Sequence, residues 1–143
     1  MNNNYELLEI NTDGGSRGNP GPAAIGVYAA SGGEEIFTLS ETIGETTNNV
    51  AEYTAVLRSL EVIEEKNIFS EKLKYFIDSE LILRQIIGKY KVKQPHLQVL
   101  REKIVSQIKR LKEKGQIKIL TFTNVPREQN KKADKLVNEA LDK

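Results

Sequence analysis

Four acidic residues, far apart in the chain, carry the carboxylate oxygens that metal ions bind, although none of them would indicate a metal site by itself: Asp13, Glu52, Asp78 and Asp134. Asp13 and Asp78 each follow a hydrophobic segment typical of a β-strand, and sites in open α/β sheets form at the carboxyl ends of strands. Glu52 and Asp134 each fall in the first turns of a predicted helix, where the helix dipole alone would favour a carboxylate. If the four converge, their repulsion raises their pKa values, and divalent cations would remove that conflict. Carboxylate ligands without histidine or cysteine suit Mg²⁺ or Mn²⁺.

Hydrophobic periodicity predicts the elements that carry these residues. Strands are expected at residues 5–12, 24–30, 35–43, 73–77 and 117–123, and helices at 48–66, 80–87, 95–115 and 130–141. Thr47 or Asn48 can cap the first helix, and Asp78 or Ser79 can cap the second. The order βββαβααβα predicts an α/β fold with a mixed sheet, antiparallel at first and parallel where helices intervene.

Composition narrows the class of protein. The 143 residues fit one domain, so we expect a single domain over residues 1–143. The chain has no cysteine and one histidine, His96, which excludes disulfides, a cysteine nucleophile and zinc sites built from thiolates or several histidines. No apolar run approaches the roughly 18 to 20 residues of a membrane span, and residues 1–4 do not resemble a signal peptide. We therefore expect a cytoplasmic monomer with no membrane partner.

Charge is divided unevenly along the chain. Residues 1–83 carry a net charge of −9, and residues 84–118 carry +9. An acidic segment joined to a basic one suits a site that holds divalent cations and approaches a polyanion. From charge alone, well-solvated lysine-rich helices are the simpler interpretation.

The segment from Asp13 to Pro22 is rich in glycine and reads as a turn. It lacks the Lys-Ser/Thr of a P-loop, the G-x-G-x-x-G spacing and the acidic positions of a calcium loop. Gly14, Gly15 and Gly18 would allow the backbone to approach a sugar-phosphate strand closely. A purely structural turn remains the alternative.

Four strings together resemble the ribonuclease H type 1 family, in the family's order and across about residues 5–141. They are Thr12-Asp13-Gly14-Gly15 with Gly18-Asn19-Pro20-Gly21-Pro22, Thr47-Asn48-Asn49-Val50-Ala51-Glu52, Ile77-Asp78-Ser79, and Asn130-Lys131-Lys132-Ala133-Asp134. The resemblance implies a five-stranded mixed sheet in the order 3-2-1-4-5. It also implies that the four carboxylates meet over the centre of that sheet.

The resemblance implies an endoribonuclease that hydrolyses the RNA strand of RNA/DNA hybrids, leaving 5′-phosphate and 3′-hydroxyl ends. Two ions, Mg²⁺ or Mn²⁺, would activate a water and stabilise the leaving oxygen. Asp13 would bridge both ions, Glu52 and Asp78 would bind one, and Asp134 would bind the other.

Substrate contacts follow from the same resemblance. The backbone amides of Gly14 and Gly15, with Glu52, are assigned to 2′-hydroxyl groups of the RNA strand, which distinguish RNA from DNA. The remaining assigned residues would contact the hybrid, mainly in its minor groove: Asn19, Asn48, Asn49 and Ser79. Helix capping is the alternative role of the Asn48-Asn49 pair, and it is compatible with substrate contact.

The chain departs from the family pattern in two places. Many members carry a histidine in the loop before the last helix, but residues 124–130 contain none, as in the short-loop branch of the family. Arg127 or Glu128 is our candidate for assisting product release there. Residues 88–95 occupy the place of a longer basic protrusion, so we expect weaker hybrid affinity.

Two other functions are compatible with the sequence. A catalytically weak module of the same fold could bind RNA/DNA hybrid or double-stranded RNA, although the intact acidic set argues against lost activity. An exonuclease or integrase with a similar acidic sheet is a further alternative, which fits the glycine-rich segment and the Asn48-Asn49 pair less well.

Overall fold

The computed structural model describes residues 3–143. In chain order, its elements are β1 (Asn4–Ser16), β2 (Gly21–Ser31), β3 (Glu34–Thr46), α1 (Asn48–Glu65), β4 (Phe69–Ile77), α2 (Glu80–Ile86), α3 (Pro95–Glu113), β5 (Ile117–Asn124), a 3₁₀ turn η1 (Arg127–Gln129) and α4 (Lys131–Leu141). Within residues 3–143, no helix is both long and apolar enough to cross a membrane.

The five strands form one mixed sheet in the order β3-β2-β1-β4-β5. β1, β2 and β3 pair antiparallel, whereas β1 with β4 and β4 with β5 pair parallel. The parallel pairs are those connected through helices, because a chain must cross the sheet before a strand can return in the same direction. The predicted topology and strand order are therefore confirmed.

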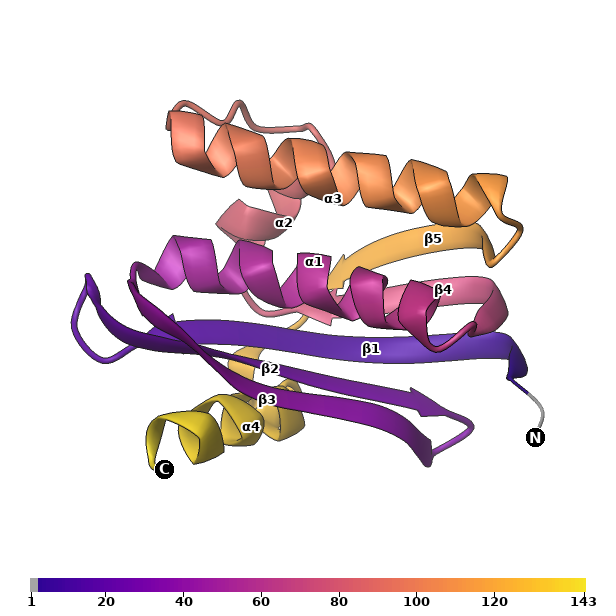
Figure 1. Ribbon diagram of the computed structural model, residues 1–143, viewed down its shortest axis with the longest axis horizontal. Coiled ribbons are helices and arrows are strands. Elements are labelled where there is room, and N and C mark those ends of the chain that lie inside the picture. The colour runs from indigo at the N-terminus through magenta and orange to yellow at the C-terminus, as the bar shows by residue number, and fades with distance from the viewer. Residues whose placement is uncertain (1–2) are drawn as a thin grey trace.

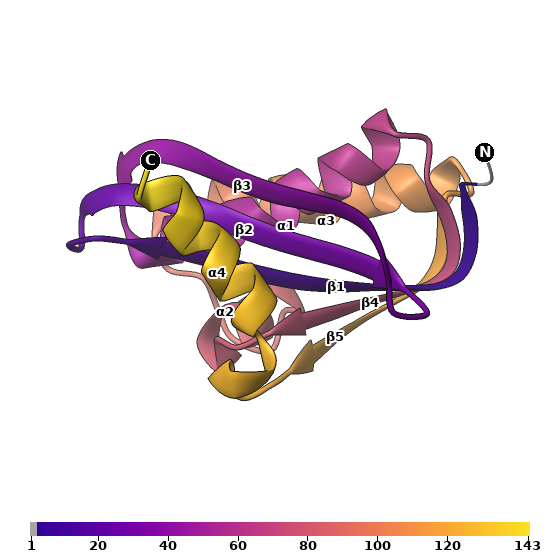
Figure 2. The same ribbon diagram turned by 90° about the horizontal axis from the view of Figure 1, so that it is seen from below.

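Helices cover the two faces of the sheet unequally. α1, α2 and α3 lie on one face, and α4 crosses the other, as Figures 1 and 2 show from two directions. Alternate residues of the central strand, such as Leu8 and Ile10, are fully buried and join one core with Tyr53, Val56 and Leu60 of α1. This two-residue period explains why β1 reads as a strand in the sequence.

The glycine-rich segment contains the predicted turn, but the turn is shorter than the sequence suggested and covers only residues 17–20, between β1 and β2. β1 continues into the segment as far as Ser16, and Asp13 and Gly15 pair with Gly26 and Ala24 of β2. Glycine serves here for close packing, since a Cβ on Gly14 would lie 2.3 Å from the Ala51 carbonyl carbon of α1. Asp13 therefore lies inside a strand rather than at its end.

Other boundaries shift by a few residues. β4 begins at Phe69, four positions before the predicted start, because Phe69 and Ser70 donate backbone hydrogen bonds to Asn3 and Gln116. Of the predicted helix caps, Thr47 caps α1 and Ser79 caps α2. The side-chain oxygen of each accepts a hydrogen bond from a backbone N–H group in the first turn of its helix. Helix α4 starts at Lys131, after the short η1 turn.

Candidate active site

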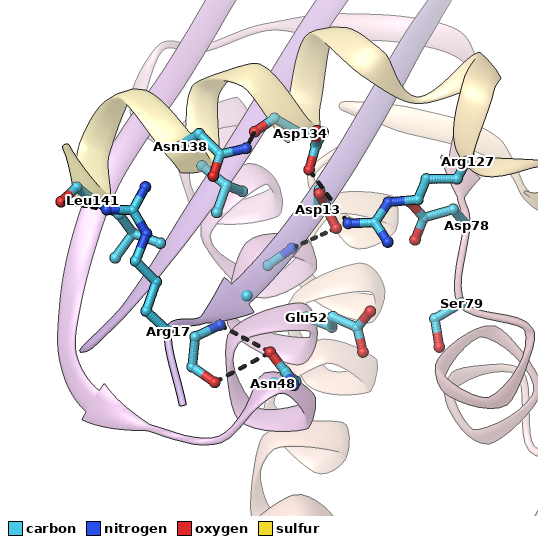
Figure 3. Close-up of a pocket in the computed structure, with 14 residues that line it drawn as sticks. Asp13, Arg17, Asn48, Glu52, Asp78, Ser79, Arg127, Asp134, Asn138 and Leu141 are labelled. Atoms are coloured by element: carbon cyan, nitrogen blue, oxygen red, sulfur yellow. Dashed lines mark hydrogen bonds and ion pairs between the residues drawn. The ribbon is translucent and has the colours of Figure 1, made fainter. Parts of the chain in front are cut away.

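Three carboxylates from three different elements gather at one point of the sheet. Asp13 projects from β1, Glu52 from α1 and Asp78 from the residue after β4, and one oxygen of each lies within 4.8 Å of the others. All three residues are half-buried. Figure 3 shows Glu52 and Asp78 lying near Asp13 in the pocket that they line.

Backbone register and close packing bring these side chains together. Thr12 of β1 pairs with Ile77 of β4 in a parallel ladder. The residues that follow them, Asp13 and Asp78, therefore lie side by side. The absence of a side chain at Gly14 lets α1 rest directly on β1 beside Asp13. Glu52 lies in the first turns of that helix and reaches the other two carboxylates.

Asp134 approaches the cluster from the opposite face of the sheet. It lies in the first turn of α4, and its carboxyl group interacts with that of Asp13. Helix α4 can approach this closely because a Cβ on Gly26 of β2 would lie 2.1 Å from the Ala133 carbonyl oxygen. Asp134 therefore adjoins Asp13 but lies outside the group of three oxygens within 4.8 Å of one another.

Burial and mutual repulsion raise two of the pKa values in the cluster. Burial, followed by the charges of Asp78 and Asp134, raises the pKa of Asp13 to about 7. Burial, followed by the charges of Asp13 and Asp78, raises the pKa of Glu52 to about 8, although the Arg127 guanidinium opposes this. Without a cation, the site therefore tends to hold protons at neutral pH.

The donor set fits a hard divalent cation. It consists of carboxylate oxygens from separate elements, and the described residues around the pocket include no histidine or cysteine. A bound dication would replace the protons and offset the repulsion that raises the pKa values. Carboxylate ligands of this kind suit Mg²⁺, Mn²⁺ and Ca²⁺.

The predicted substrate residues divide into two groups. Gly14, Gly15, Asn48 and Ser79 line the same pocket as the carboxylates, whereas Asn19 and Asn49 do not. The Asn48 Oδ1 accepts a hydrogen bond of 2.8 Å from the Ser16 amide, which joins the end of β1 to the start of α1. The Asn19 Oδ1 accepts from the Asn48 amide at 3.1 Å, so Asn19 supports the pocket rim from outside.

Arg127 and Glu128 occupy the η1 turn but lie differently with respect to the pocket. The Arg127 side chain is 81% exposed, extends toward Asp13 in Figure 3, and places Nη2 3.8 Å from Asp134 Oδ1. Glu128 does not line the pocket. Of the two candidates for product release, only Arg127 is thus in reach of the carboxylates.

Two asparagines in the network beneath the carboxylates were not among the predicted site residues. Asn130 is fully buried, and its side chain bonds to Asn11, to the Thr12 carbonyl and to Asp78. Asn130 belongs to one of the four family-like strings, which was the only signal for it in the sequence. Asn11 gave no signal, because its role depends on a contact across 119 positions.

Comparisons with known proteins agree with this geometry. The family described as reverse transcriptase-like matches residues 11–140. The structure of LC11-RNase H1, isolated from compost by a metagenomic approach, superposes with a TM-score of 0.83 at 44% identity over 96% of both chains. The same protein in complex with an RNA/DNA hybrid matches with a TM-score of 0.81 at 46% identity, over 94% of this chain and 96% of that chain. The chain therefore belongs to the type 1 ribonuclease H family.

Two sequence relatives are longer than this chain. Ribonuclease HI of Halobacterium salinarum is 37% identical over 131 residues, which cover 91% of this chain and 62% of the relative. A bifunctional protein of Mycobacterium tuberculosis is 36% identical over 138 residues, which cover 93% of this chain and 35% of the relative. The chain thus spans about a third of the length of the first curated relatives that it matches.

Proposed function

We propose that this protein hydrolyses the RNA strand of RNA/DNA hybrids and leaves 5′-phosphate and 3′-hydroxyl ends. The convergence of Asp13, Glu52 and Asp78 from three separate elements carries this proposal. The likeness to LC11-RNase H1, which has been solved with an RNA/DNA hybrid, supports the same substrate class.

The four carboxylates would hold two Mg²⁺ or Mn²⁺ ions, with Asp13 shared between them, Glu52 and Asp78 at one, and Asp134 at the other. When bound, such ions lower the pKa of an attacking water and stabilise the leaving oxygen of a phosphodiester. The protein contributes orientation, because β1 and the helices fix the carboxylates before substrate arrives.

Residues around the carboxylates would select and release the substrate. Gly14 and Gly15 line the pocket, and their amides would contact RNA 2′-hydroxyl groups, although the Gly14 amide donates to Asp13 Oδ1 at 3.0 Å in this structure. The side chains of Asn48 and Ser79 lie on the same rim. Arg127 would assist product release, an assignment supported by its exposed guanidinium, which lies 3.8 Å from Asp134 Oδ1 and is free to move with a departing phosphate.

A cleavage assay tests the proposal directly. A hybrid with a labelled RNA strand is incubated with wild type and with Asp13→Asn in Mg²⁺ or Mn²⁺, beside duplex RNA and duplex DNA. We expect cleavage of the RNA strand of the hybrid alone, with 5′-phosphate ends, and its loss in the variant. Tight hybrid binding without cleavage would support a binding module instead, and cleavage of duplex DNA would contradict the proposal.

A further inference from the structure

The residue at the start of α4 does not behave as a helix cap. Asparagine is among the best N-cap residues, because its side-chain oxygen accepts from an N–H group of the first turn. Asn130 occupies this position, but its side chain makes no capping hydrogen bond, and its backbone departs from the extended conformation of Thr47 and Ser79. Its side chain is therefore used elsewhere.

The side chain is directed into the protein, beneath the carboxylates. Asn130 is 0% exposed. Its Nδ2 donates to the Thr12 carbonyl oxygen at 2.9 Å and lies 3.4 Å from Asp78 Oδ2. Its Oδ1 accepts from Asn11 Nδ2 at 2.9 Å, so the amide is engaged at both ends.

The backbone of the same residue completes the connection. The Asn130 carbonyl oxygen accepts from the Asp134 amide at 3.1 Å, and the Asn130 amide donates to the Arg127 carbonyl oxygen at 3.0 Å. One buried residue thus contacts the strand position before Asp13, the carboxylate of Asp78 and the backbone of Asp134. These groups belong to β1, the end of β4 and α4.

We propose that Asn130 is a positioning residue that fixes the separation of Asp13, Asp78 and Asp134 for metal binding, an inference that rests on the proposed function. The bond to the Thr12 carbonyl holds the strand that carries Asp13. The contact with Asp78 orients that carboxylate, in the way that groups behind metal ligands commonly orient them. Asn11 fixes which end of the amide faces Asp78, since its Nδ2 requires an acceptor.

A metal titration with Asn130→Ala tests this role independently of cleavage. Isothermal titration with Mn²⁺ alone should show affinity weakened about tenfold or more, the range typical when the support of a ligand is removed. In the hybrid assay, kcat should fall about ten- to a hundredfold while KM for the hybrid changes less than about twofold. Measurements are made well below the lowest melting temperature of the proteins compared, with folding checked by circular dichroism.

Asn124→Ala is the matched control. The Asn124 Nδ2 donates to the Ile77 carbonyl oxygen at 3.0 Å, one residue before Asp78, just as Asn130 donates to the carbonyl one residue before Asp13. Unlike Asn130, within residues 3–143 Asn124 makes no hydrogen bond to a carboxylate of the cluster. Its removal should lower stability and leave Mn²⁺ affinity within about twofold. A second variant, Asn11→Ala, lies at a less buried position and should weaken Mn²⁺ binding in the same direction but less, which covers the case in which Asn130→Ala does not fold.

The outcomes separate the two proposals. If Asn130→Ala folds and binds Mn²⁺ as tightly as wild type, or if Asn124→Ala weakens binding equally, the positioning role is wrong. If Asn130→Ala does not fold, unchanged Mn²⁺ affinity of Asn11→Ala would overturn it. If the variants weaken Mn²⁺ binding as expected but wild type does not cleave the hybrid, the positioning role stands and the proposed function fails.

Discussion

At the scale of single residues, the carboxylates around Asp13 lower the free energy of unfolding of the metal-free protein. A buried acid with a raised pKa stays protonated in the folded chain at pH values where the unfolded chain has released the proton. Asp13, with a pKa of about 7 against an ordinary value of 3.8, and Glu52, with a pKa of about 8 against 4.5, both follow this rule. The free energy of unfolding without metal should therefore fall as pH rises from about 4 to about 8.

Asp13→Asn removes much of this destabilisation, because the amide carries no charge. The folded state binds more protons than the unfolded state between about pH 4 and pH 7, so the carboxylate destabilises the metal-free protein fully only above that window. We expect the variant to be more stable than wild type by about 2 to 4 kcal/mol at pH 8 with chelator present, and nearly equal at pH 4. Urea unfolding at both pH values measures this.

Added Mg²⁺ provides the second half of the same test. It should stabilise wild type by binding the folded state only, and stabilise Asp13→Asn much less. Equal stability of the two proteins at pH 8 without metal would show that repulsion and burial at Asp13 are weaker than the structure indicates.

At the scale of elements, two glycines set how closely helices approach the sheet. Gly14 admits α1 beside Asp13, and Gly26 admits α4 so that Asp134 reaches the same carboxylate. Their Cα atoms belong to paired strands, since Asp13 pairs with Gly26 across the ladder. The site is thus built where two helices from opposite faces pack directly against the backbone of the central strands.

Substitution of the two neighbouring glycines of β1 should have unequal effects. In Gly14→Ala the new Cβ would lie 2.3 to 2.5 Å from backbone atoms of Ala51 and Glu52, so α1 must move. We expect a loss of about 3 kcal/mol of stability and displacement of Glu52. In Gly15→Ala the nearest atoms are 3.8 Å away, so urea unfolding should show a change below about 1 kcal/mol. Similar losses in both variants would contradict the close-approach argument.

A charged cluster joins α1 to α3 on the helical face. Glu64 accepts from Gln107 at 2.8 Å, from Lys114 at 2.9 Å and from Arg110 at 2.6 Å. The hydrogen bonds from Gln107, Lys114 and Arg110 lower the pKa of Glu64 to about 2. A depressed pKa of this kind stabilises the fold above the unfolded value of 4.5, and the contribution is lost as pH falls toward 2.

Glu64→Gln tests this contribution by its pH dependence. The variant should be less stable than wild type at pH 7, and the difference should shrink as pH is lowered from 4.5 toward 2, where the wild-type carboxyl group also becomes neutral. Denaturant titrations across this range measure the difference. A difference independent of pH would mean that shape, rather than charge, explains the loss.

At the scale of the whole molecule, the acidic and basic parts of the sequence serve different regions. The acidic part supplies three of the four carboxylates, and the basic part begins in α2 and continues through the α2–α3 connection and α3. Lys89, Lys91 and Lys93 are exposed in that connection. A polyanion at the carboxylates could extend toward these lysines, which supplies a reason for the charge division seen in the sequence.

Replacing Lys89, Lys91 and Lys93 by glutamine tests this arrangement. The three substitutions are added to Asp13→Asn, and binding of the hybrid is measured without metal. We expect the affinity for the hybrid to fall. The slope of log affinity against log salt concentration should also become shallower, by up to about one unit for each phosphate that a lysine no longer neutralises. A matched triple substitution at Lys66, Lys72 and Lys118, which are exposed at the opposite ends of α1, β4 and β5, should leave both unchanged. Equal effects of the two triple variants would mean that only total charge matters.

The sequence by itself determined the order of the elements, the strand order through family resemblance, and the three carboxylates that converge, Asp13, Glu52 and Asp78. These depend on local periodicity and on short strings, which neighbouring residues define. Residues 13–16 of the glycine-rich segment were wrongly predicted as part of the turn, because a glycine that admits a helix and a glycine that bends the chain look alike in sequence. Nothing local distinguishes Asn48 and Ser79, which line the pocket, from Asn19 and Asn49, which do not.

Only the tertiary structure decided what Asn130 does. Its sequence position favours a helix cap, whereas its side chain is buried against Thr12, 118 positions away, and against Asp78. The same holds for the distance between Asp134 and the other carboxylates, which depends on how α4 packs over Gly26. Such contacts are set by the packing of whole elements against one another, and the pattern along a single segment carries no record of them.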